Sequence, residues 1–275
     1  MNSFSILILT YNEEKNISAA IQSVAWADDV VVLDSFSTDR TVKIARENNA
    51  HVFQREFDDF GSQRNYGLNE IQFKHKWVFH LDADERFNDD LKKECDRVIS
   101  LDEKSAYFVP NKIIFMGKWI KHSTQYPHPQ VRLVKIGAAD FVKAGHGQRE
   151  GKAEKGIGYI DKAYDHYNFS KGITDWIEKH NRYSSEEALL AIKTKRRPIQ
   201  ECISRNLMIR KRAMKSWFVK MPFRPLLKFT YLYFFRLGLL DGRAGFAYCI
   251  LQSIYEYMIV LKIWELKRSE RGLSI

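Results

Sequence analysis

The sequence predicts an α/β fold in which a mostly parallel sheet is covered by helices on both faces. Short apolar runs alternate with segments of helical periodicity through the first eighty or so residues, and polar residues follow each run. Strands that alternate with helices of about ten to fifteen residues form right-handed crossovers and pair in parallel. The 275 residues suffice for one large core, or for one core with a smaller appendage.

The chain begins with a predicted strand and helix. The apolar run FSILIL at 4–9 has the length of a strand. The following segment places Ile17, Ile21 and Val24 on one helical face, and Asn12 is the expected N-cap. A strand therefore leads into a helix.

The same unit recurs along the chain. Residues 28–35 (DDVVVLDS) form a predicted second strand, and Asp39 caps the helix after it. A third strand and helix are expected at 50–55 and 62–73, and a fourth strand at 76–81. Ligands of such sheets lie beyond the carboxyl ends of the strands, so we expect the site at that edge.

Acidic residues follow the fourth strand in HLDADERF. Asp82 and Asp84, two positions apart, can converge on one hard cation and leave room for water and phosphate oxygens, which suits Mg²⁺ or Mn²⁺. An alternative is that Asp84 or Glu85 caps the next helix. Because polar residues also follow the first two strands, and clustered carboxylates repel one another without a cation, the pattern favours a metal site. Those residues are Thr10, Tyr11, Asn12, Glu13, Asp34 and Ser35.

The cysteines and histidines predict no structural metal. Cys95, Cys202 and Cys249 are far apart and lack metal-ligand spacing, so we expect reduced thiols in a cytosolic setting. The histidines have neither i, i+4 spacing nor a nearby cysteine, which argues against zinc. The first residues lack the pattern of a signal peptide.

The rear of the chain is strongly basic and apolar. Residues 193–243 contain 14 Lys or Arg and two acids, whereas residues 1–192 contain 26 basic and 29 acidic residues. Residues 244–264 are about as long as a bilayer-spanning helix, but polar residues interrupt them. We expect helices that lie in the membrane interface with basic side chains on anionic lipid.

Two alternatives to a membrane-associated rear remain open. Nucleic-acid binding would explain the cations but not the apolar stretches, so no nucleic-acid partner is expected. The segment could also pack on the core or on a second copy of the chain, as a homo-oligomer. Pro222 and Pro225 are expected to divide it into at least two helices.

The motifs TYNEE, VVLDSFSTDRT and HLDADE, in this order, resemble the nucleotide-sugar-binding domain of glycosyltransferase family 2, which has the GT-A fold. FGSQRN, GKWIKHSTQYPHPQVRLVK and WIEKHNRYSSEEA are similar to bacterial lipopolysaccharide-core glucosyltransferases that act on heptose, and to related surface-polysaccharide enzymes. The resemblance implies a catalytic domain at 1–192, with a nucleotide-sugar half to about residue 100 and an acceptor half at 101–192. Residues 193–275 would form the membrane-associating region.

The resemblance also implies roles for residues at the strand ends. Arg64 would approach the pyrophosphate, where a planar guanidinium can bind two oxygens, and Asp84 would contact Mg²⁺ or Mn²⁺. The residues expected around uracil, ribose and the donor sugar are Thr10, Tyr11, Glu13, Asp34 and Asp82.

Inverting transfer needs a base for the acceptor hydroxyl. The family places a carboxylate after the fifth or sixth strand, and FVKAGHGQREG offers Glu150, with His146 as an orienting or substrate-contacting group. The lipopolysaccharide relatives have an adjacent His-Glu pair, whereas GQR separates the two residues here. The alternative is a polar surface loop.

The expected acceptor residues come from two segments. Trp119, Tyr126 and Arg132 suit stacking on sugars and binding of hydroxyls or phosphates. Lys179 and Arg182 match the same subgroup and would contact a phosphate of donor or acceptor.

Together these features predict an inverting, metal-dependent glycosyltransferase at the cytoplasmic face of the inner membrane, held there peripherally. It would move a sugar from a nucleotide donor, UDP-linked glucose or N-acetylhexosamine, to a lipid-carried glycan of lipopolysaccharide or surface polysaccharide. One alternative is a nucleotidyltransferase, although LTYNEEKN lacks the usual glycine-rich phosphate loop. The other is a catalytically inactive module that binds membrane or polysaccharide.

Overall fold

The computed structural model describes residues 3–124, 126–144, 147–219, 221 and 223–274. Its contacts divide the chain into two units. The α/β unit contains the residues up to Trp119 and those from Tyr126 to Lys171, and the helical unit contains 120–124 and the residues from Gly172 onward. By contacts the division therefore falls at Lys171, ahead of the boundary at 192 predicted from the sequence.

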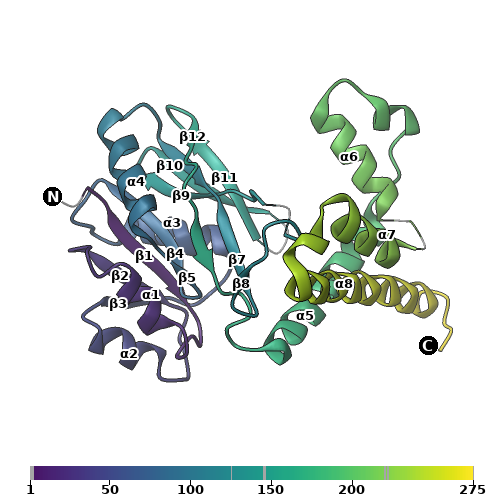
Figure 1. Ribbon diagram of the computed structural model, residues 1–275, viewed down its shortest axis with the longest axis horizontal. Coiled ribbons are helices and arrows are strands. Elements are labelled where there is room, and N and C mark those ends of the chain that lie inside the picture. Colours follow the sequence, from purple (N-terminus) through teal and green to yellow (C-terminus); the bar gives the residue numbers. More distant parts are fainter. Residues whose placement is uncertain (1–2, 125, 145–146, 220, 222, 275) are drawn as a thin grey trace. The chain divides into compact units, whose positions relative to one another are not determined.

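The main sheet of the α/β unit has seven strands in the order β12-β6-β9-β4-β1-β2-β3. Strands β1 to β4 run parallel, and β9 is antiparallel to its neighbours β4 and β6. The sheet is thus mostly parallel, as predicted (Figure 1). Its strands are β1 (Ser5–Thr10), β2 (Val30–Asp34), β3 (His51–Gln54), β4 (Trp77–Asp82), β6 (Ala106–Val109), β9 (Gln130–Lys135) and β12 (Ile157–Tyr159).

Helices follow the first four strands. They are α1 (Ile17–Ser23), α2 (Thr41–Glu47), α3 (Phe60–Glu70) and α4 (Asp89–Leu101). The N-cap of α2 is Arg40, one residue after the predicted cap Asp39, whose carboxylate accepts a hydrogen bond from the first-turn N–H of Thr41 at 2.9 Å. Asn12 was wrongly predicted to cap α1, because that helix begins after Asn16.

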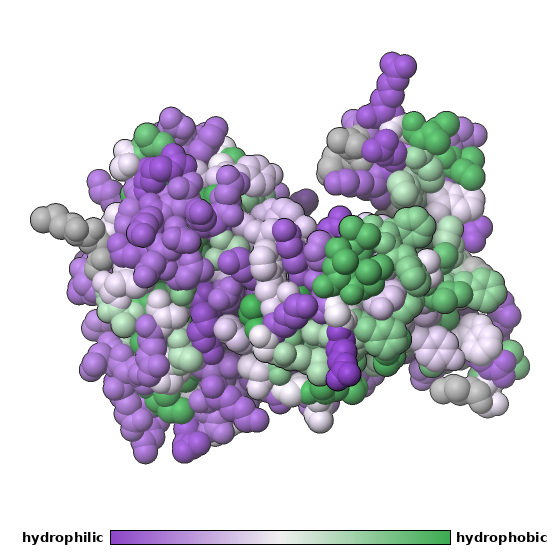
Figure 2. Space-filling model, viewed as in Figure 1, coloured by the Kyte–Doolittle hydropathy of each residue, from purple (hydrophilic) through white to green (hydrophobic). Residues whose placement is uncertain are grey.

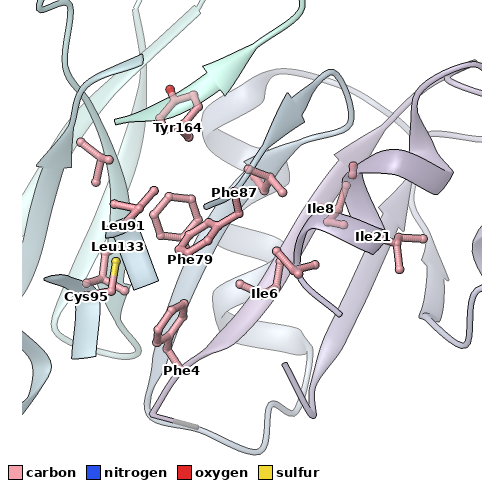
Figure 3. Packing of buried hydrophobic residues seen from close by; sticks show 14 of the residues in the cluster. Phe4, Ile6, Ile8, Ile21, Phe79, Phe87, Leu91, Cys95, Leu133 and Tyr164 are labelled. Carbon is pink, nitrogen blue, oxygen red and sulfur yellow. The ribbon is translucent and has the colours of Figure 1, made fainter. Parts of the chain in front are cut away.

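Apolar side chains bury both faces of the sheet. On one face Ile6, Ile8 and Phe79 pack with residues of α1 and α4 (Figure 3). On the other face, Leu7 and Leu33 pack with Leu68 of α3. This alternation along the strands is the reason that their sequences read as continuous apolar runs.

Two smaller sheets complete the α/β unit. One has the order β5-β13-β7-β8, and the other is the antiparallel pair β10-β11. The strands of the first are β5 (Glu85–Arg86), β13 (Tyr164–His166), β7 (Asn111–Phe115) and β8 (Lys118–Trp119). The hairpin consists of β10 (Ala139–Ala144) and β11 (Gly147–Ala153).

The helical unit is built around two long helices, α5 (Ile173–Lys193) and α8 (Gly242–Ser269), which pack on each other. Asp241 anchors the segment 120–124, because its carboxylate accepts backbone N–H bonds from His122 at 3.0 Å and Ser123 at 2.8 Å. The remaining elements are α6 (Leu207–Phe218), α7 (Arg224–Thr230), the 3-10 turns η1 (Ile199–Ile203) and η3 (Gly238–Asp241), and the π-helical turn η2 (Tyr231–Phe235). Pro225 lies in the first turn of α7, and Pro222 is outside the described residues.

Between Ala244 and Trp264, helix α8 has two charged residues, and both contact the inner helices. Glu256 is buried and pairs with Arg224 of α7 at 2.5 Å, and the Lys262 ammonium bonds Asn181 Oδ1 of α5 at 2.6 Å. The exposed residues of this stretch are apolar, and hydrophobic side chains gather over the helical unit (Figure 2). Within the described residues, Gly238–Ser269 alone has the length and composition of a membrane span.

Candidate active site

The strand register brings the predicted polar residues together. Thr10 at the end of β1 is paired with Asp34 at the end of β2, and Leu9 is paired with Asp82 at the end of β4. Adjacent strands are only about 4.8 Å apart. The prediction that these residues meet at one edge of the sheet is therefore confirmed.

Asp34 is fully buried and orders the loop after β2. It accepts hydrogen bonds from Ser37 N at 2.9 Å and Gln54 Nε2 at 3.0 Å. Ser37 Oγ in turn accepts from Asn12 N at 2.8 Å, and Asn12 Oδ1 accepts from Thr38 N at 2.8 Å. Asn12 thus joins two strand-end loops, and its positive φ of 53° fits this bracing role rather than a helix cap.

Two aromatic side chains project from these loops. Tyr11 is 56% exposed and Phe36, with a φ of 58°, is 53% exposed. Thr10, which precedes Tyr11, is buried, and its hydroxyl has no hydrogen-bond partner among the described residues. Exposed aromatic faces beside a buried polar edge suit stacking on a planar ring.

Glu13 is held by residues from a distant segment. Its carboxylate pairs with Lys171 at 2.5 Å and accepts a hydrogen bond from Asn16 Nδ2 at 2.7 Å. Burial raises the pKa of Glu13, although both partners oppose the rise. The segment after β13 therefore closes one side of the strand-end site.

Asp82 is fixed by two buried arginines. Its Oδ1 pairs with Arg64 of α3 at 2.8 Å and its Oδ2 with Arg132 of β9 at 2.9 Å. Arg132 also pairs with Glu85 at 2.6 Å, and Glu85 accepts a hydrogen bond from Asp82 N at 2.8 Å. Each charge in this network has a partner, as buried ionic groups require.

The network shifts the pKa values of its two carboxylates, Asp82 and Glu85, in opposite directions. Burial disfavours the charged form of Asp82, but the charges of Arg132 and Arg64 outweigh burial and hold the pKa of Asp82 well below its usual range. For Glu85 burial dominates and raises the pKa to about 7 despite Arg132. Asp82 is thus a firmly ionised acceptor of hydrogen bonds.

The side chains of Arg64 and Arg132 are both buried. Each residue is only 1% exposed. Arg64 Nε donates to Gln148 Oε1 of β11 at 2.9 Å, and Arg132 Nε donates to Tyr164 Oη at 3.1 Å. Both guanidinium groups therefore hold Asp82 in place, and the predicted contacts of Arg64 with the pyrophosphate and of Arg132 with the acceptor stay predictions.

Asp84 faces an imidazole that the sequence did not assign to the site. Its Oδ2 lies 3.3 Å from His166 Nε2 of β13, and both side chains are 22% exposed. Burial alone would lower the pKa of His166, but Asp84 raises it to about 9. Neither Asp84 nor Glu85 caps α4, because Asn88 does so by accepting from Leu91 N at 3.0 Å.

A divalent metal fits this pair as an open site. A carboxylate oxygen and an imidazole nitrogen are ligands that Mn²⁺ accepts, and the pair is close enough to share one ion. No group of three or more His, Cys, Asp or Glu in the described part of the chain could hold a metal. The protein would therefore supply two ligands, and phosphate oxygens and water the rest.

The predicted base lies on the hairpin. Glu150 is an exposed residue of β11, two positions after Gln148, which contacts Arg64. Its side chain makes no hydrogen bond or ion pair with the residues that the structure describes. His146 falls outside those residues, and the role of either side chain stays a prediction.

The other acceptor candidates fall in both units. Trp119 and Tyr126 form an edge-to-face pair with centroids 5.1 Å apart, and Lys112 lies 5.2 Å from the Trp119 ring. Lys179 pairs with Asp175 along α5 at 3.1 Å, and Arg182 is exposed on the same helix. Their contact with an acceptor stays a prediction.

An open α/β sheet with acids, arginines and an imidazole at the carboxyl ends of its strands defines a nucleotide-binding enzyme with the GT-A arrangement. The chain belongs to glycosyltransferase family 2, because the model of that family, Glycosyl transferase family 2, matches residues 5–218.

Several known proteins are similar to the chain. An uncharacterized glycosyltransferase of Rickettsia typhi is 25% identical over 285 residues, 99% of this chain and 90% of that protein. The lipopolysaccharide core biosynthesis glycosyltransferase LpsC of Rhizobium meliloti is 23% identical over 269 residues, 95% and 92% of the two chains. A crystal structure of Staphylococcus aureus TarS 1–349 with UDP has 19% identity and a TM-score of 0.46, and covers 97% of this chain and 92% of that chain.

Proposed function

We propose that the protein is an inverting, metal-dependent glycosyltransferase that takes a sugar from a UDP-linked donor. The observation that carries this proposal is the Asp84–His166 pair beside the ends of β1, β2 and β4. Membership of glycosyltransferase family 2 supports transfer of a sugar and argues against a nucleotidyltransferase. The donor sugars that we favour are glucose and N-acetylhexosamine.

The strand ends would hold the nucleoside. Tyr11 and Phe36 present aromatic faces to the uracil ring, and the unpartnered Thr10 hydroxyl is a ready hydrogen-bonding group. Asp82 would accept hydrogen bonds from the ribose or the donor sugar, because its arginine partners keep it ionised.

The metal would lie against Asp84 and His166. These two side chains would hold Mn²⁺ or Mg²⁺, which when bound would supply positive charge for the departing nucleoside diphosphate. Because the metal ligand must be the neutral imidazole, His166 would release its proton on binding. The ion pair seen between His166 and Asp84 would then be the metal-free form of the site.

Glu150 is the proposed base for the acceptor hydroxyl. Asp82 is a poor alternative, since both of its oxygens are engaged and its pKa is low. The side chain of Glu150 is exposed and has no partner in the described part of the chain, so an acceptor hydroxyl can reach its carboxylate.

The acceptor is proposed to be a lipid-carried glycan of lipopolysaccharide or surface polysaccharide at the cytoplasmic face of the inner membrane. LpsC is named for lipopolysaccharide core biosynthesis, which supports this class of acceptor. The basic helical unit with its exposed apolar residues supports peripheral membrane attachment.

Donor hydrolysis tests the proposed function. A panel of nucleotide sugars is incubated with the full-length protein in Mn²⁺, in Mg²⁺ or in EDTA, and nucleoside diphosphate release is measured. We expect release from a UDP-sugar with metal, and loss of metal-dependent donor binding in Asp84→Asn and His166→Gln. Glu154→Gln is a matched control, since this residue lies outside the site. Equal turnover in EDTA would contradict the metal assignment, and no turnover with any donor would favour the inactive binding module.

A further inference from the structure

The helical unit contains a cavity with a strongly basic lining. Its volume is about 250 Å³, and the wall is formed by the end of α5, the segment after it, α6 and the start of α7. Sites that enclose a drug-sized ligand usually measure about 300 to 1,000 Å³. This cavity therefore suits a small group rather than a whole nucleotide sugar.

Four cations and one acid line the cavity. The cations are Lys195, Arg197, Arg212 and Arg224, and the acid is Glu187. Arg197 pairs with Glu201 at 2.7 Å and Arg224 with Glu256 at 2.5 Å. Lys195 and Arg212 have no ion-pair partner among the residues described, so their charges stay uncompensated.

The wall of the cavity is held in place by contacts that do not involve Lys195 or Arg212. Trp217 Nε1 of α6 donates to the carbonyl of Arg197 at 3.0 Å, and Arg196 lies 4.9 Å from the Trp217 ring. Arg197 N donates to Ser216 Oγ at 3.1 Å. The segment between α5 and α6 is therefore fixed while its cations line an open space.

Arg224 adds an unsatisfied donor. The residue is 5% exposed, and its Nε has no hydrogen-bond partner in the described part of the chain. An unsatisfied buried donor destabilises the fold, and clustered cations repel each other unless an anion lies among them. The cavity is thus better suited to an anion than to solvent alone.

The apolar part of the lining indicates what carries the anion. Leu190 and Val219 line the cavity, and Phe223, next to Arg224 in the sequence, is 70% exposed. A ligand with a compact anionic head and an apolar tail would match both features. We propose that this cavity binds the phosphate group of a membrane lipid, an inference that rests on the proposed action at a membrane surface.

The test compares two pairs of substitutions with the same charge change. Lys195→Gln with Arg212→Gln removes the uncompensated cations, whereas Arg210→Gln with Lys211→Gln removes two exposed cations of α6 that do not line the cavity. Arg224 is left intact, because its loss would strand the buried Glu256. Thermal unfolding of each full-length variant checks that it is folded, and Lys195→Gln alone, compared with Lys211→Gln alone, replaces the two pairs if the first pair does not fold.

Calorimetry with inorganic pyrophosphate in EDTA gives the first result. We expect the cavity pair to lower the affinity about tenfold or more, since it removes two charge-assisted contacts, and the α6 pair to leave it nearly unchanged. If both pairs of substitutions lower the affinity for pyrophosphate equally, the anion is attracted to the basic surface in general, and the proposed cavity site is wrong.

Flotation with phosphatidylcholine vesicles that contain phosphatidic acid identifies the source of the phosphate. We expect the cavity pair to reduce flotation more than the α6 pair does, and free pyrophosphate to compete. Unchanged flotation in the cavity pair, with pyrophosphate binding lost, would assign the cavity to a soluble phosphate and overturn the lipid source. Donor hydrolysis in the same preparations reports separately on the proposed function.

Discussion

At the scale of single residues, Asp82 and Glu150 show how environment separates two carboxylates. Asp82 is clamped by Arg64 and Arg132, which stabilise its ionised form. Glu150 is exposed on β11 and unclamped by the residues described. A base must take up a proton in the transition state, and a strongly depressed pKa works against this. The environment therefore favours Glu150.

Replacing Glu150 by Gln keeps the side-chain shape and removes the proton acceptor. Donor affinity should persist, while transfer to the acceptor falls by about 10² or more. Equilibrium binding of the UDP-sugar and single-turnover transfer measure the two quantities. Glu154→Gln, at the end of the same hairpin region, should change neither. If Glu150→Gln transfers at the parent rate, the base lies elsewhere and His146 becomes the next residue to test.

The sequence predicted which acids gather at the strand ends but not their partners. Asp34, Asp82 and Asp84 followed from the strand pattern, because parallel strands place their carboxyl ends together. His166 and Lys171 lie far along the chain from Asp84 and Glu13, and only the placement of β13 beside β5 and β7 brings them near. The residues around His166 and Lys171 in the sequence do not indicate these long-range contacts. For Arg132, the sequence pattern is the same whether the side chain is buried or exposed.

At the scale of elements, α3 shows a close approach that helix propensity does not reveal. Gly67 lies against Leu7 of β1, and a Cβ on this residue would lie 2.4 Å from Leu7 Cδ2. Leu7 is fully buried in the sheet, so it has little freedom to move. The glycine thus lets α3 pack closely and hold Arg64 against Asp82.

Gly67→Ala should therefore destabilise the protein, although Ala is favoured over Gly by about 1 kcal/mol within helices. Overpacking of a core typically costs about 1 to 3 kcal/mol, and we expect a lower midpoint of urea unfolding. Asn69→Ala, exposed on the same helix, should leave the midpoint unchanged or raise it slightly. A gain in stability from Gly67→Ala would show that Leu7 yields to the added methyl.

The limits of prediction at this scale lie in loops. The first four strands and three helices were predicted to within a few residues, because apolar periodicity reports burial directly. The start of α1 was not, since Asn12 bonds to the neighbouring loop instead of to its own helix. Capping depends on which backbone groups a side chain meets, and here those groups come from another strand end.

At the scale of the whole molecule, charge and exposed apolar surface both concentrate in the helical unit. The sequence already indicated the basic charge, but it could not tell which face of α8 carries the polar interruptions. The structure places Glu256 and Lys262 inward on α7 and α5. Between residues 244 and 264 the outer face of α8 is apolar, and charged residues are exposed only at the two ends of the helix; the exposed apolar residues are Phe246, Ile250, Ile254, Tyr257, Leu261 and Trp264.

Because the polar residues of α8 face the other helices and its apolar residues face outward, we expect α8 to lie in the plane of the membrane interface. A spanning α8 would draw its partner α5 into the bilayer or separate from it, and α5 exposes Glu178, Arg182 and Glu186. A charged residue at the bilayer centre costs about 2.5 to 3.5 kcal/mol on insertion scales. An α8 that lies in the interface keeps the Arg224–Glu256 ion pair and the hydrogen bond from Lys262 to Asn181. Its outer apolar residues then contact the lipid.

Ile254→Gln with Leu261→Gln should reduce binding to anionic vesicles about tenfold or more, because each buried aliphatic side chain contributes about 1.5 to 3 kcal/mol. Thermal stability should change little, since both residues are exposed. Leu101→Gln with Met116→Gln, at exposed apolar positions of the α/β unit, should leave vesicle binding unchanged. Protease treatment of sealed inverted membrane vesicles then decides the orientation of α8. If the residues after Trp264 are protected inside the vesicle while the α/β unit is digested, α8 spans the bilayer and the interfacial arrangement is wrong.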